Sequence, residues 1–285
     1  MTLKNLNTKY KKMRESFFAG LLKKTKWVRR ETLLIHKIST ATRIASSMSV
    51  VEIFVALFYG KILKYKNKNC KWELRSRLII SKGHGAICLY PILADLGFFR
   101  KEELKNVCKN NALLGGIPDP KIPGIETVNG SLGHGLGYAC GVALALKEKK
   151  IKTNIFVILS DGELCEGSVW EGLMFAAKHS LNNIIVILDN NKTTMLDFTK
   201  NIIDIKNLNK ILINMGWLVK DVDGNNIKKI YQTLFSINKN SINKPKFINA
   251  NTIKGMGVRY LEGQQLSHIM SLTENQINDS FIKNL

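Results

Sequence analysis

Two runs of five apolar residues constrain the fold of this chain more than any other feature of its sequence. Residues 155–159 and 184–188 contain only Ile, Val, Leu and Phe, and an expected helix at residues 167–179 separates them. Continuous apolar strands on either side of a helix are typical of a parallel sheet that is covered by helices. Further elements continue the alternation, with expected strands at residues 217–222 and 246–252 and an expected helix near residues 226–238. The sequence therefore predicts one α/β domain, a doubly wound parallel sheet with helices on both faces.

The first half of the chain gives weaker signals for the same kind of alternation. We expect helix over most of residues 27–65, where Ser49 and Glu52 have the spacing of a capping box at a helix start. A short apolar run at residues 78–81 predicts a strand that enters a tight glycine turn. The remaining expected elements are a helix at residues 86–96, a loop rich in Gly and Pro at residues 110–137, and a helix at residues 135–150.

The N-terminus is strongly basic, since Glu15 is the only acid between Lys4 and Arg30. Its apolar stretch is shorter than the ~7 to 15 residues of a signal-peptide core. We therefore interpret this segment as a surface helix that leads into the fold. On this basis the chain divides into a basic helical extension at residues 1–29 and one domain at residues 30–285.

The net charge of +21 at pH 7 raises the question of a nucleic-acid or membrane partner. The lysines are spread along the chain among Asn and Ile residues and form no recognisable binding motif. No stretch reaches the ~18 to 20 apolar residues of a membrane-spanning helix. We therefore expect neither nucleic acid nor a membrane as partner. The five cysteines form no CxxC pair, which argues against a disulfide framework or zinc site and favours a reduced, cytoplasmic protein.

Two polar residues that follow the apolar strands suggest a cation site. Asp161 comes soon after the first strand, and Asn191 follows the second strand 30 positions later. The carboxyl ends of parallel strands meet at one edge of a sheet, where ligands bind in such folds. Mg²⁺ takes oxygen ligands and often receives only a few of them from protein. A magnesium site and a simple Asp-Gly turn thus remain open alternatives for Asp161.

The residues around these two positions resemble a known cofactor-binding signature. The stretch from Ser160 to Asn191 is similar to the thiamine diphosphate (ThDP) signature, which begins with Gly-Asp-Gly and ends with Asn-Asn. Its intervening residues resemble those of the transketolase family. Three further segments resemble motifs of that family, namely residues 81–85, 130–137 and 253–258. The resemblance extends from about Arg30 to His268.

The resemblance implies a ThDP-binding domain over residues 30–285 and assigns roles to individual residues. It implies that Asp161 and Asn191 bind Mg²⁺ through their side chains and that Thr193 adds its backbone carbonyl. The residues that it places at the cofactor are His84, Gly130, Leu132, Gly162, Glu163, Asn191 and His268.

The resemblance also implies a set of catalytic candidates, which are His84, His268, Glu166 and Glu171. The two histidines would lie near the reacting centre, and the two glutamates would lie at a subunit interface near the cofactor-activating glutamate. Trp170 is expected to pack at an interface or in the core rather than react. His134 stands where the family has Gln and receives no role.

The reaction that the resemblance implies is the transfer of a two-carbon ketol unit from a ketose to an aldehyde, with ThDP carrying the carbanion chemistry. In this family the cofactor-activating glutamate belongs to a second, pyrimidine-binding domain, for which a chain of 285 residues has no room. We therefore expect the N-terminal subunit of a split transketolase. It would be active only with a C-terminal partner subunit, in a hetero-oligomer that we expect to be a heterotetramer.

Two positions depart from the family at the sugar site. Arg43 and Ile117 stand where the family has histidines that contact the sugar. Arginine is permanently charged, and isoleucine has no hydrogen-bonding group. Three interpretations remain open, namely an ordinary split transketolase, a ThDP-dependent carboligase with an altered sugar substrate in specialised sugar biosynthesis, and a non-catalytic ThDP-binding or assembly subunit.

Overall fold

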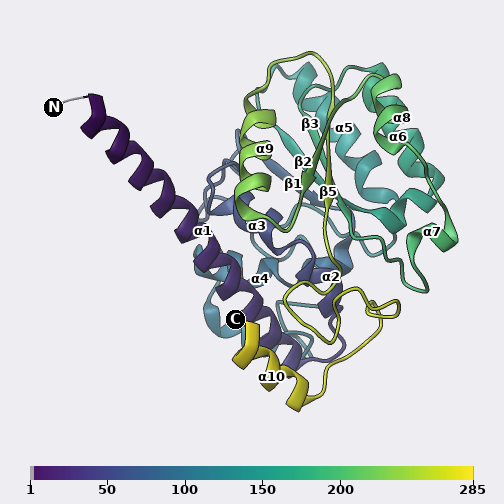
Figure 1. The fold of residues 1–285 in the computed structure, drawn as a ribbon. Helices are drawn as coiled ribbons and strands as arrows, with labels where there is room; N and C mark the ends of the chain where they lie inside the picture. The colour runs from purple at the N-terminus through teal and green to yellow at the C-terminus, as the bar shows by residue number, and fades with distance from the viewer. Residues whose placement is uncertain (1–2, 285) are drawn as a thin grey trace.

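The structure, a computed structural model, describes residues 3–284 and the side chains of residues 12–281 (Figure 1). A parallel sheet of five strands lies at its centre. The strands are β1 (Arg77–Ile80), β2 (Ile155–Ser160), β3 (Ile184–Asn190), β4 (Leu218–Asp223) and β5 (Lys246–Asn251). Their order across the sheet is β1-β2-β3-β5-β4, and every neighbouring pair is parallel. The predicted α/β fold class is confirmed.

The strand sequences are apolar at successive positions because the sheet separates two hydrophobic layers. Phe156 and Ile158 of β2 belong to the layer under α3 (Val51–Phe58) and α9 (Ile227–Lys239). Val157 and Leu159 belong to the opposite layer, under α5 (His134–Glu148) and α6 (Gly167–Lys178). Successive side chains of a strand point to opposite faces, so a strand that is buried on both faces needs apolar residues throughout.

The other described helices complete the two layers and the margin of the sheet. They are α1 (Leu3–Ile38), α2 (Ile44–Met48), α4 (Leu89–Asp95), α7 (Thr199–Ile202), α8 (Leu208–Asn214) and α10 (Glu274–Asn284), with short 3-10 segments at Gly83–Gly85, Lys101–Asn106 and Asp161–Cys165. The predicted helices at residues 135–150, 167–179 and 226–238 correspond closely to α5, α6 and α9. The helices α7, α8 and α10 were not predicted.

The basic N-terminal segment is part of α1, which is one continuous helix of 36 residues. The second half of α1 packs against α3, α4 and α9, whereas its first half projects away from the rest of the molecule (Figure 1). The helix passes position 29 without a break. The division of the chain between residues 29 and 30 thus remains a prediction about domains that the secondary structure does not mark.

Two predictions about helix starts were wrong. Helix α3 begins after Val50 and has no side-chain cap. The Ser49 hydroxyl donates instead to Asp189 over 2.7 Å, and Glu52 pairs with Arg29 of α1. The expected capping box does not form because both of its side chains are used in buried contacts between elements. Helix α4 begins at Leu89 rather than at residue 86.

After β5 the chain crosses the carboxyl end of the sheet as irregular backbone before it enters α10 (Figure 1). Two side chains of α1 hold this segment. Arg29 Nε donates to the Met256 carbonyl over 3.0 Å, and His36 Nε2 accepts from the Leu272 backbone N–H at 3.2 Å. The segment that passes over the strand ends is therefore fixed to α1.

Two further observations concern membrane-spanning helices and the state of the cysteines. No helix among residues 3–284 combines the length and the apolar character that crossing a membrane requires. All five cysteines are free thiols. Cys88 and Cys140 are buried, Cys70 is half-buried, and Cys108 and Cys165 are exposed.

Candidate active site

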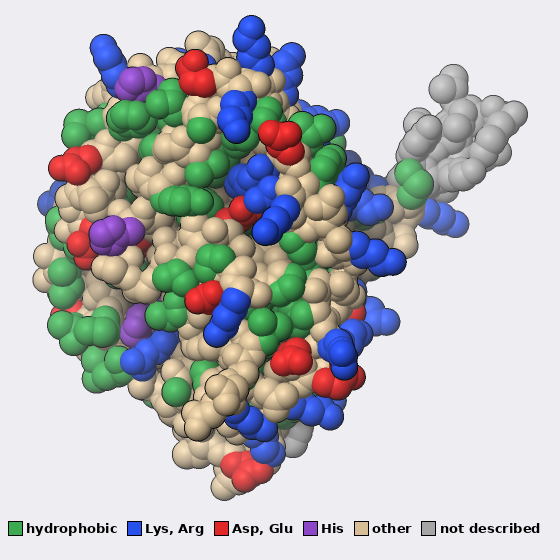
Figure 2. Space-filling model, turned by 180° about the vertical axis from the view of Figure 1, so that it is seen from behind, with side chains coloured by type: hydrophobic (Ala, Val, Ile, Leu, Met, Phe, Trp, Pro, Cys, Tyr) green, Lys and Arg blue, Asp and Glu red, His purple; other side chains and the backbone are tan. Residues whose placement is uncertain are grey.

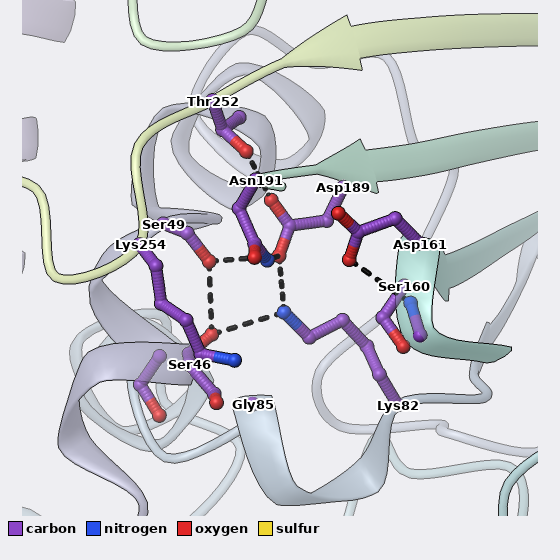
Figure 3. Close-up of polar contacts among 12 residues, drawn as sticks. Ser46, Ser49, Lys82, Gly85, Ser160, Asp161, Asp189, Asn191, Thr252 and Lys254 are labelled. Carbon is purple, nitrogen blue, oxygen red and sulfur yellow. Dashed lines mark hydrogen bonds and ion pairs between the residues drawn. The ribbon is translucent and has the colours of Figure 1, made fainter. Parts of the chain in front are cut away.

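The predicted cation ligands come together at the carboxyl end of the sheet. Asp161 follows β2, and Asn191 follows β3, the neighbour of β2 in the sheet. The two residues are almost fully buried, with 2% and 5% of their surfaces exposed. Figure 3 shows both beside Asp189 of β3. The parallel register thus gathers three oxygen-bearing side chains from two strands at one place.

Backbone and side-chain donors hold the Asp161 carboxylate. Its Oδ1 accepts from the Gly162 N–H at 3.0 Å, and its Oδ2 accepts from the Lys192 N–H at 2.6 Å and from the Thr199 hydroxyl at 3.1 Å. Burial, together with the nearby Asp189 carboxylate, raises the pKa of Asp161 to about 6. The raised pKa means that these hydrogen bonds and the charge of Lys254 compensate the negative charge only in part. A bound cation would supply this compensation.

Asn191 and Thr193 provide two further oxygens near Asp161. The Asn191 amide nitrogen donates to Asp189 over 2.9 Å, and its Oδ1 accepts from the Thr193 N–H at 3.1 Å. The Thr193 carbonyl accepts from the ammonium of Lys254 at 2.8 Å. A carboxylate, an amide and a carbonyl form an all-oxygen set, which suits Mg²⁺. Only one side chain of this set is acidic. The set therefore differs from a cluster of three His, Cys, Asp or Glu side chains, and no such cluster that could hold a metal ion is found among the described residues.

A buried ion pair beneath these groups was not predicted from the sequence. Lys82 and Asp189 form a salt bridge, with side chains that are 1% and 0% exposed. Asp189 also accepts from the hydroxyls of Ser49 and Thr252 (Figure 3). Burial opposes ionisation, but the Lys82 charge and these hydrogen bonds hold the pKa of Asp189 below its ordinary value. The pair ties the turn after β1 to β3 and forms the floor of the site.

A second buried lysine, Lys254, was also missed. It is 3% exposed, and its ammonium donates to the carbonyls of Thr193 at 2.8 Å and Thr194 at 3.2 Å. No ion pair of the described part of the chain includes Lys254. Burial, together with the charge of Lys82, lowers the pKa of Lys254 to about 8. A buried ammonium without a paired carboxylate is suited to an anionic ligand.

The two predicted histidines lie side by side at this site. The ring centroids of His84 and His268 are 4.9 Å apart, and His268 Nδ1 lies 3.3 Å from both Ser46 Oγ and Lys254 Nζ. Burial and the charge of Lys82 lower the pKa of His84 to about 2. Burial and the charge of Lys254 lower the pKa of His268 to about 3. Both rings are therefore neutral near pH 7, and each offers one donor and one acceptor.

A glycine loop at residues 130–133 borders the site, and Glu163 holds it. The buried Glu163 carboxylate accepts from the Ser81 hydroxyl at 2.5 Å, from the Gly133 N–H at 3.0 Å and from the Ser160 N–H at 3.0 Å. Gly133 has a φ of +83°, and a Cβ there would lie 2.5 Å from a hydroxyl oxygen of α6. This position therefore requires glycine. The recorded contacts of Glu163, which the resemblance placed at the cofactor, are all with the protein itself.

The remaining predicted residues are less buried than Asp161 and Asn191. Those that are exposed are Gly130, His134, Glu166 and Glu171, and those that are half-buried are Leu132 and Gly162. Trp170 Nε1 donates to the Leu164 carbonyl over 2.9 Å, and its ring packs on the core under α6. Trp170 thus packs against the core of its own chain.

The two positions where the resemblance implies a histidine are Arg43 and Ile117, and the surface around them is called the entrance of the site. Arg43 directly precedes α2 and is exposed. Its charge adds to burial and to the buried lysines in lowering the pKa of His84 and His268. Ile117 is 41% exposed, and its side chain lies 3.2 Å and 3.6 Å from where Cβ atoms on Gly83 and Gly130 would stand. The entrance thus has a permanent positive charge and an apolar side chain at these two positions.

Comparison with known proteins gives a family and two groups of relatives. The family described as "Transketolase, thiamine diphosphate binding domain" matches residues 35–283. The chain is 38% identical over 250 residues to one of the subunits of the apulose-4-phosphate transketolase of Actinobacillus succinogenes, and the match covers 87% of this chain and 90% of that protein. It is 36% identical over 232 residues to a 6-deoxy-6-sulfo-D-fructose transketolase subunit of a Clostridium strain, and this match covers 81% of this chain and 84% of that protein.

The second group consists of longer proteins. The transketolase of Campylobacter jejuni has a solved structure that matches this chain with a TM-score of 0.85 and 27% identity. The match covers 92% of this chain but 42% of that chain. Human transketolase is 34% identical over 231 residues, which is 81% of this chain and 36% of that protein. The chain thus spans about two fifths of these longer enzymes.

Proposed function

The chain belongs to the transketolase family, and from this membership we propose that it is the N-terminal, diphosphate-binding subunit of a split transketolase. In the proposed reaction a two-carbon ketol unit passes from a ketose to an aldehyde. Relatives that are named transketolase subunits support the proposal, because the matches cover 90% and 84% of their length. The observation that carries it is the buried ammonium of Lys254, which donates to the carbonyl of Thr193 and is influenced by the charge of Asp161.

We propose that Mg²⁺ binds between Asp161, Asn191 and Thr193. These groups fit the ion because all three offer hard oxygen atoms and follow adjacent strand ends. The raised pKa of Asp161, caused by burial and by Asp189, indicates a carboxylate whose charge Lys254 compensates only in part. Magnesium commonly completes its shell with phosphate oxygens and water, so three protein ligands are sufficient.

The diphosphate of ThDP fits the positive charge beside these ligands. Lys254 would bind a phosphate oxygen, because its ammonium is buried and has only carbonyls and a histidine as recorded partners. Gly162 would allow close approach of the backbone, since a Cβ at this position would have no neighbour nearer than 3.9 Å. A buried cation and an open backbone turn at a strand end are together suited to a diphosphate.

When bound, ThDP supplies the carbanion chemistry, and the chain supplies binding and orientation. Lys254 can only donate, so Nδ1 of His268 is an acceptor and the proton of this neutral ring is on Nε2. Ser46, also 3.3 Å from Nδ1, helps to fix the ring. His84 and His268 would thus present neutral hydrogen-bonding groups to the hydroxyls of a sugar.

Exposed apolar side chains near the site support a protein partner. They form an apolar rim that consists of Ile117, Met195, Leu196, Ile253, Leu266 and Ile269, which are 41% to 63% exposed. Gln265 Nε2 donates to Asp197 over 2.7 Å, so two segments of the rim lie in contact. Contiguous exposed apolar groups mark interaction surfaces. We propose that the C-terminal, pyrimidine-binding subunit covers the rim in a cytoplasmic heterotetramer.

Arg43 and Ile117 support a more specific form of the proposal, in which the sugar differs from that of ordinary transketolases. Arg43 adds a permanent charge beside the two neutral histidines. Ile117 offers only apolar contact between Gly83 and Gly130. A substrate whose end near Arg43 and Ile117 is anionic or carries fewer hydroxyl groups would suit these two side chains better than the hydroxylated end of an ordinary ketose phosphate.

The proposal is tested by purifying the chain together with its partner subunit in Mg²⁺ and ThDP. We expect xylulose 5-phosphate and ribose 5-phosphate, or another ketose and aldehyde pair, to react only when both subunits are present. Asp161→Asn is expected to weaken binding of Mg²⁺-ThDP by at least about 100-fold in calorimetry, because it removes the carboxylate ligand. Asp204→Asn, at an exposed aspartate, serves as the matched control.

Each outcome decides between the interpretations. Full activity of the chain alone would overturn the split organisation. Failure of Mg²⁺-ThDP to bind in the intact complex would favour a non-catalytic assembly subunit. Bound ThDP without turnover of the two pentose phosphates would indicate a different sugar, and Arg43→His with Ile117→His is then expected to increase activity on them.

A further inference from the structure

A cavity of about 700 Å³ lies at the amino ends of the strands, at the end of the sheet opposite the candidate active site. The residues that directly precede β1, β2 and β3 line it together with the first residue of β5, and these are Ser76, Asn154, Asn183 and Lys246. The parallel register places them side by side. Asp161 follows β2 at its carboxyl end. The length of a six-residue strand, about 20 Å, therefore separates the cavity from the candidate active site.

Lysines are the only charged side chains among the described residues that line the cavity. They are Lys64, Lys147, Lys150, Lys152 and Lys246. No ion pair within residues 12–281 includes any of them. Figure 2 shows Lys and Arg side chains at the upper end of the molecule, where Figure 1 shows the loop between α9 and β5. Five positive charges without a carboxylate among them favour an anionic ligand.

Lys246 differs from the lysines that are spread over the surface, because it is only 3% exposed. Its ammonium donates to the Asn182 carbonyl over 2.7 Å. Burial lowers the pKa of Lys246 below its ordinary value. A buried ammonium costs free energy unless it is compensated, and one carbonyl compensates it only in part. An anion in the cavity would complete the compensation.

A buried oxygen of Asn183 indicates a second property of the ligand. The amide nitrogen of Asn183 donates to the Ala143 carbonyl over 2.9 Å, which leaves Oδ1 as an acceptor. This Oδ1 is buried and has no hydrogen-bond partner among the described residues. Buried acceptors are normally paired. A ligand that carries N–H or O–H groups beside its anionic group would satisfy Asn183.

Three isoleucines also line the cavity, and they indicate a third property. They are Ile62 after α3, Ile151 before β2 and Ile242 in the loop between α9 and β5. The volume is within the ~300 to 1,000 Å³ of pockets that hold small organic ligands, and a phosphate ion alone would leave most of it empty. A sugar phosphate supplies charge and hydroxyl donors but no flat apolar ring. A nucleoside phosphate supplies all three properties, since its base has apolar faces and its base and ribose carry donors.

We propose that the cavity at the amino ends of the strands binds a nucleoside phosphate, with the phosphate groups at the lysines and the base beside the isoleucines. Ligands of open α/β sheets bind outside the carboxyl ends of the strands, so the fold does not imply this second site. The inference depends on the residues of the cavity and not on the proposed reaction. Either can therefore fail without the other.

The test measures binding of ADP to the full chain by calorimetry in the absence of Mg²⁺. Adenosine lacks the phosphate groups, whereas inorganic pyrophosphate and ribose 5-phosphate lack the base. We expect each of these three compounds to bind at least about tenfold more weakly than ADP, because each loses one set of contacts. Added salt is expected to weaken the binding of ADP.

Variants of the lysines test the position of the site. Lys246→Met removes the buried ammonium and should weaken ADP binding at least about tenfold. Lys64→Glu with Lys152→Glu reverses two charges at the cavity and should weaken it by at least as much. Both of these positions are exposed, so the double variant tests the site even if Lys246→Met unfolds the chain. Lys23→Glu with Lys26→Glu makes the same change in net charge at exposed positions of α1 and should leave the affinity almost unchanged.

Two measurements distinguish the cavity from the proposed ThDP site, which could also take a diphosphate. Asp161→Asn should leave the affinity for ADP unchanged, and saturating Mg²⁺-ThDP should not displace ADP. Hydrogen exchange of the amides at residues 150–154 and 240–246 is expected to slow when ADP binds.

Four results would overturn the proposal. They are no binding of ADP at millimolar concentration, binding of pyrophosphate or ribose 5-phosphate as tight as that of ADP, equal losses for the double variants at the cavity and on α1, and displacement of ADP by Mg²⁺-ThDP. The second would identify a site for simple anions or sugar phosphates. The third would indicate attraction to the net charge of +21, and the fourth would place ADP at the proposed cofactor site.

Discussion

Lys82, Asp189 and Lys254 bring two ammonium groups and one carboxylate into the protein interior next to Asp161. Each buried ion costs several kcal/mol unless it is compensated. Lys82 and Asp189 compensate each other, whereas Lys254 is left with carbonyl and imidazole partners. The Lys82–Asp189 pair is thus stabilised within the protein. Asp161 and Lys254 remain available for a metal ion and an anion.

The Lys82–Asp189 pair is expected to be critical for stability. Lys82→Met would leave Asp189 buried without its counter-ion and should lower the free energy of unfolding by about 3 to 5 kcal/mol in urea titrations. The double variant Lys82→Met with Asp189→Asn is expected to recover part of this loss. Lys229→Met, which removes an exposed pair with Asp223 at 3.5 Å, should cost less than about 1 kcal/mol. Equal losses for the two single variants would contradict this role.

Glu163 is expected to contribute to stability and to ThDP binding because it holds the glycine loop at residues 130–133. Glu163→Gln places an amide NH₂ among groups that donate to the carboxylate, including the Gly133 and Ser160 N–H groups. We expect a loss of about 1 to 3 kcal/mol in unfolding free energy and weaker ThDP binding, because the loop borders the site. Glu148→Gln, at an exposed position at the end of α5, is the control and should change neither. Unchanged ThDP affinity in Glu163→Gln would separate the loop from the cofactor.

Among single residues, the sequence predicted those that lie at the spacing of the cofactor-binding signature. It did not reveal that Lys82 and Lys254 are buried at the site. Asp161, Asn191 and Thr193 lie together because they follow adjacent parallel strands. Lys82 lies within the motif at residues 81–85, but its burial depends on Asp189, 107 positions away. Local patterns do not distinguish a lysine that finds such a partner from one on the surface. The long-range pairing decides its environment.

Among the elements, prediction succeeded where burial on both sides imposes an apolar sequence. β2 and β3 are buried at every position, and their limits were predicted within two residues. The expected cap of α3 failed because the Ser49 hydroxyl reaches Asp189, 140 positions away. A charged acceptor in the interior forms a stronger hydrogen bond than a backbone N–H at a helix start. Helices α7 and α8 are short and weakly patterned, so their sequences gave no clear period.

His36 makes the attachment of the C-terminal segment to α1 sensitive to acid. Its Nδ1 lies 2.8 Å from the Thr42 hydroxyl, and its Nε2 accepts from Leu272. Burial lowers the pKa of His36 to about 4, against 6.5 for an exposed histidine. Below pH ~6.5 the unfolded chain binds a proton that the folded chain does not bind until about pH 4. Stability is therefore complete above this window and decreases through it as the pH falls.

The expected contribution of His36 to this loss is on the order of 3 kcal/mol between pH 7 and pH 4, and His84 and His268, whose pKa values are also lowered, add to it. Urea unfolding at several pH values measures it. His36→Gln should make the free energy of unfolding less dependent on pH in this window, whereas His179→Gln, at an exposed residue, should leave the dependence unchanged. An unchanged slope in His36→Gln would show that other groups cause the acid sensitivity.

At the scale of the whole molecule, the apolar rim is expected to form the interface with the partner subunit. Leu196 is 63% exposed within the rim, and Leu196→Glu should weaken the complex by at least about tenfold, because a central apolar contact becomes a buried charge. Leu74→Glu changes an apolar residue that is 50% exposed outside the rim and is the control. Analytical ultracentrifugation of the two subunits measures both. Equal affinities would place the interface elsewhere.

The order of the strands is the feature of the whole molecule that the sequence could not supply. β5 lies between β3 and β4, although it follows β4 in the chain. The strands have similar lengths, and nothing in the spacing of the elements fixes which neighbours pair. The polar pattern of β4, with Lys220, Asp221 and Asp223 exposed, agrees with its position at an edge.

This order has a consequence for biosynthesis. The ribosome completes β4 before β5, and at ~5 to 20 residues per second the strand waits a few seconds for its only neighbour in the described sheet. During that interval the edge of β3 is open, and β4 could add to it in the place of β5. Such an insertion would bury Lys220 and Asp221, which are exposed at the edge, at a large cost in desolvation. The charges on β4 thus protect the nascent chain against a wrong strand order until the correct neighbour has been synthesised.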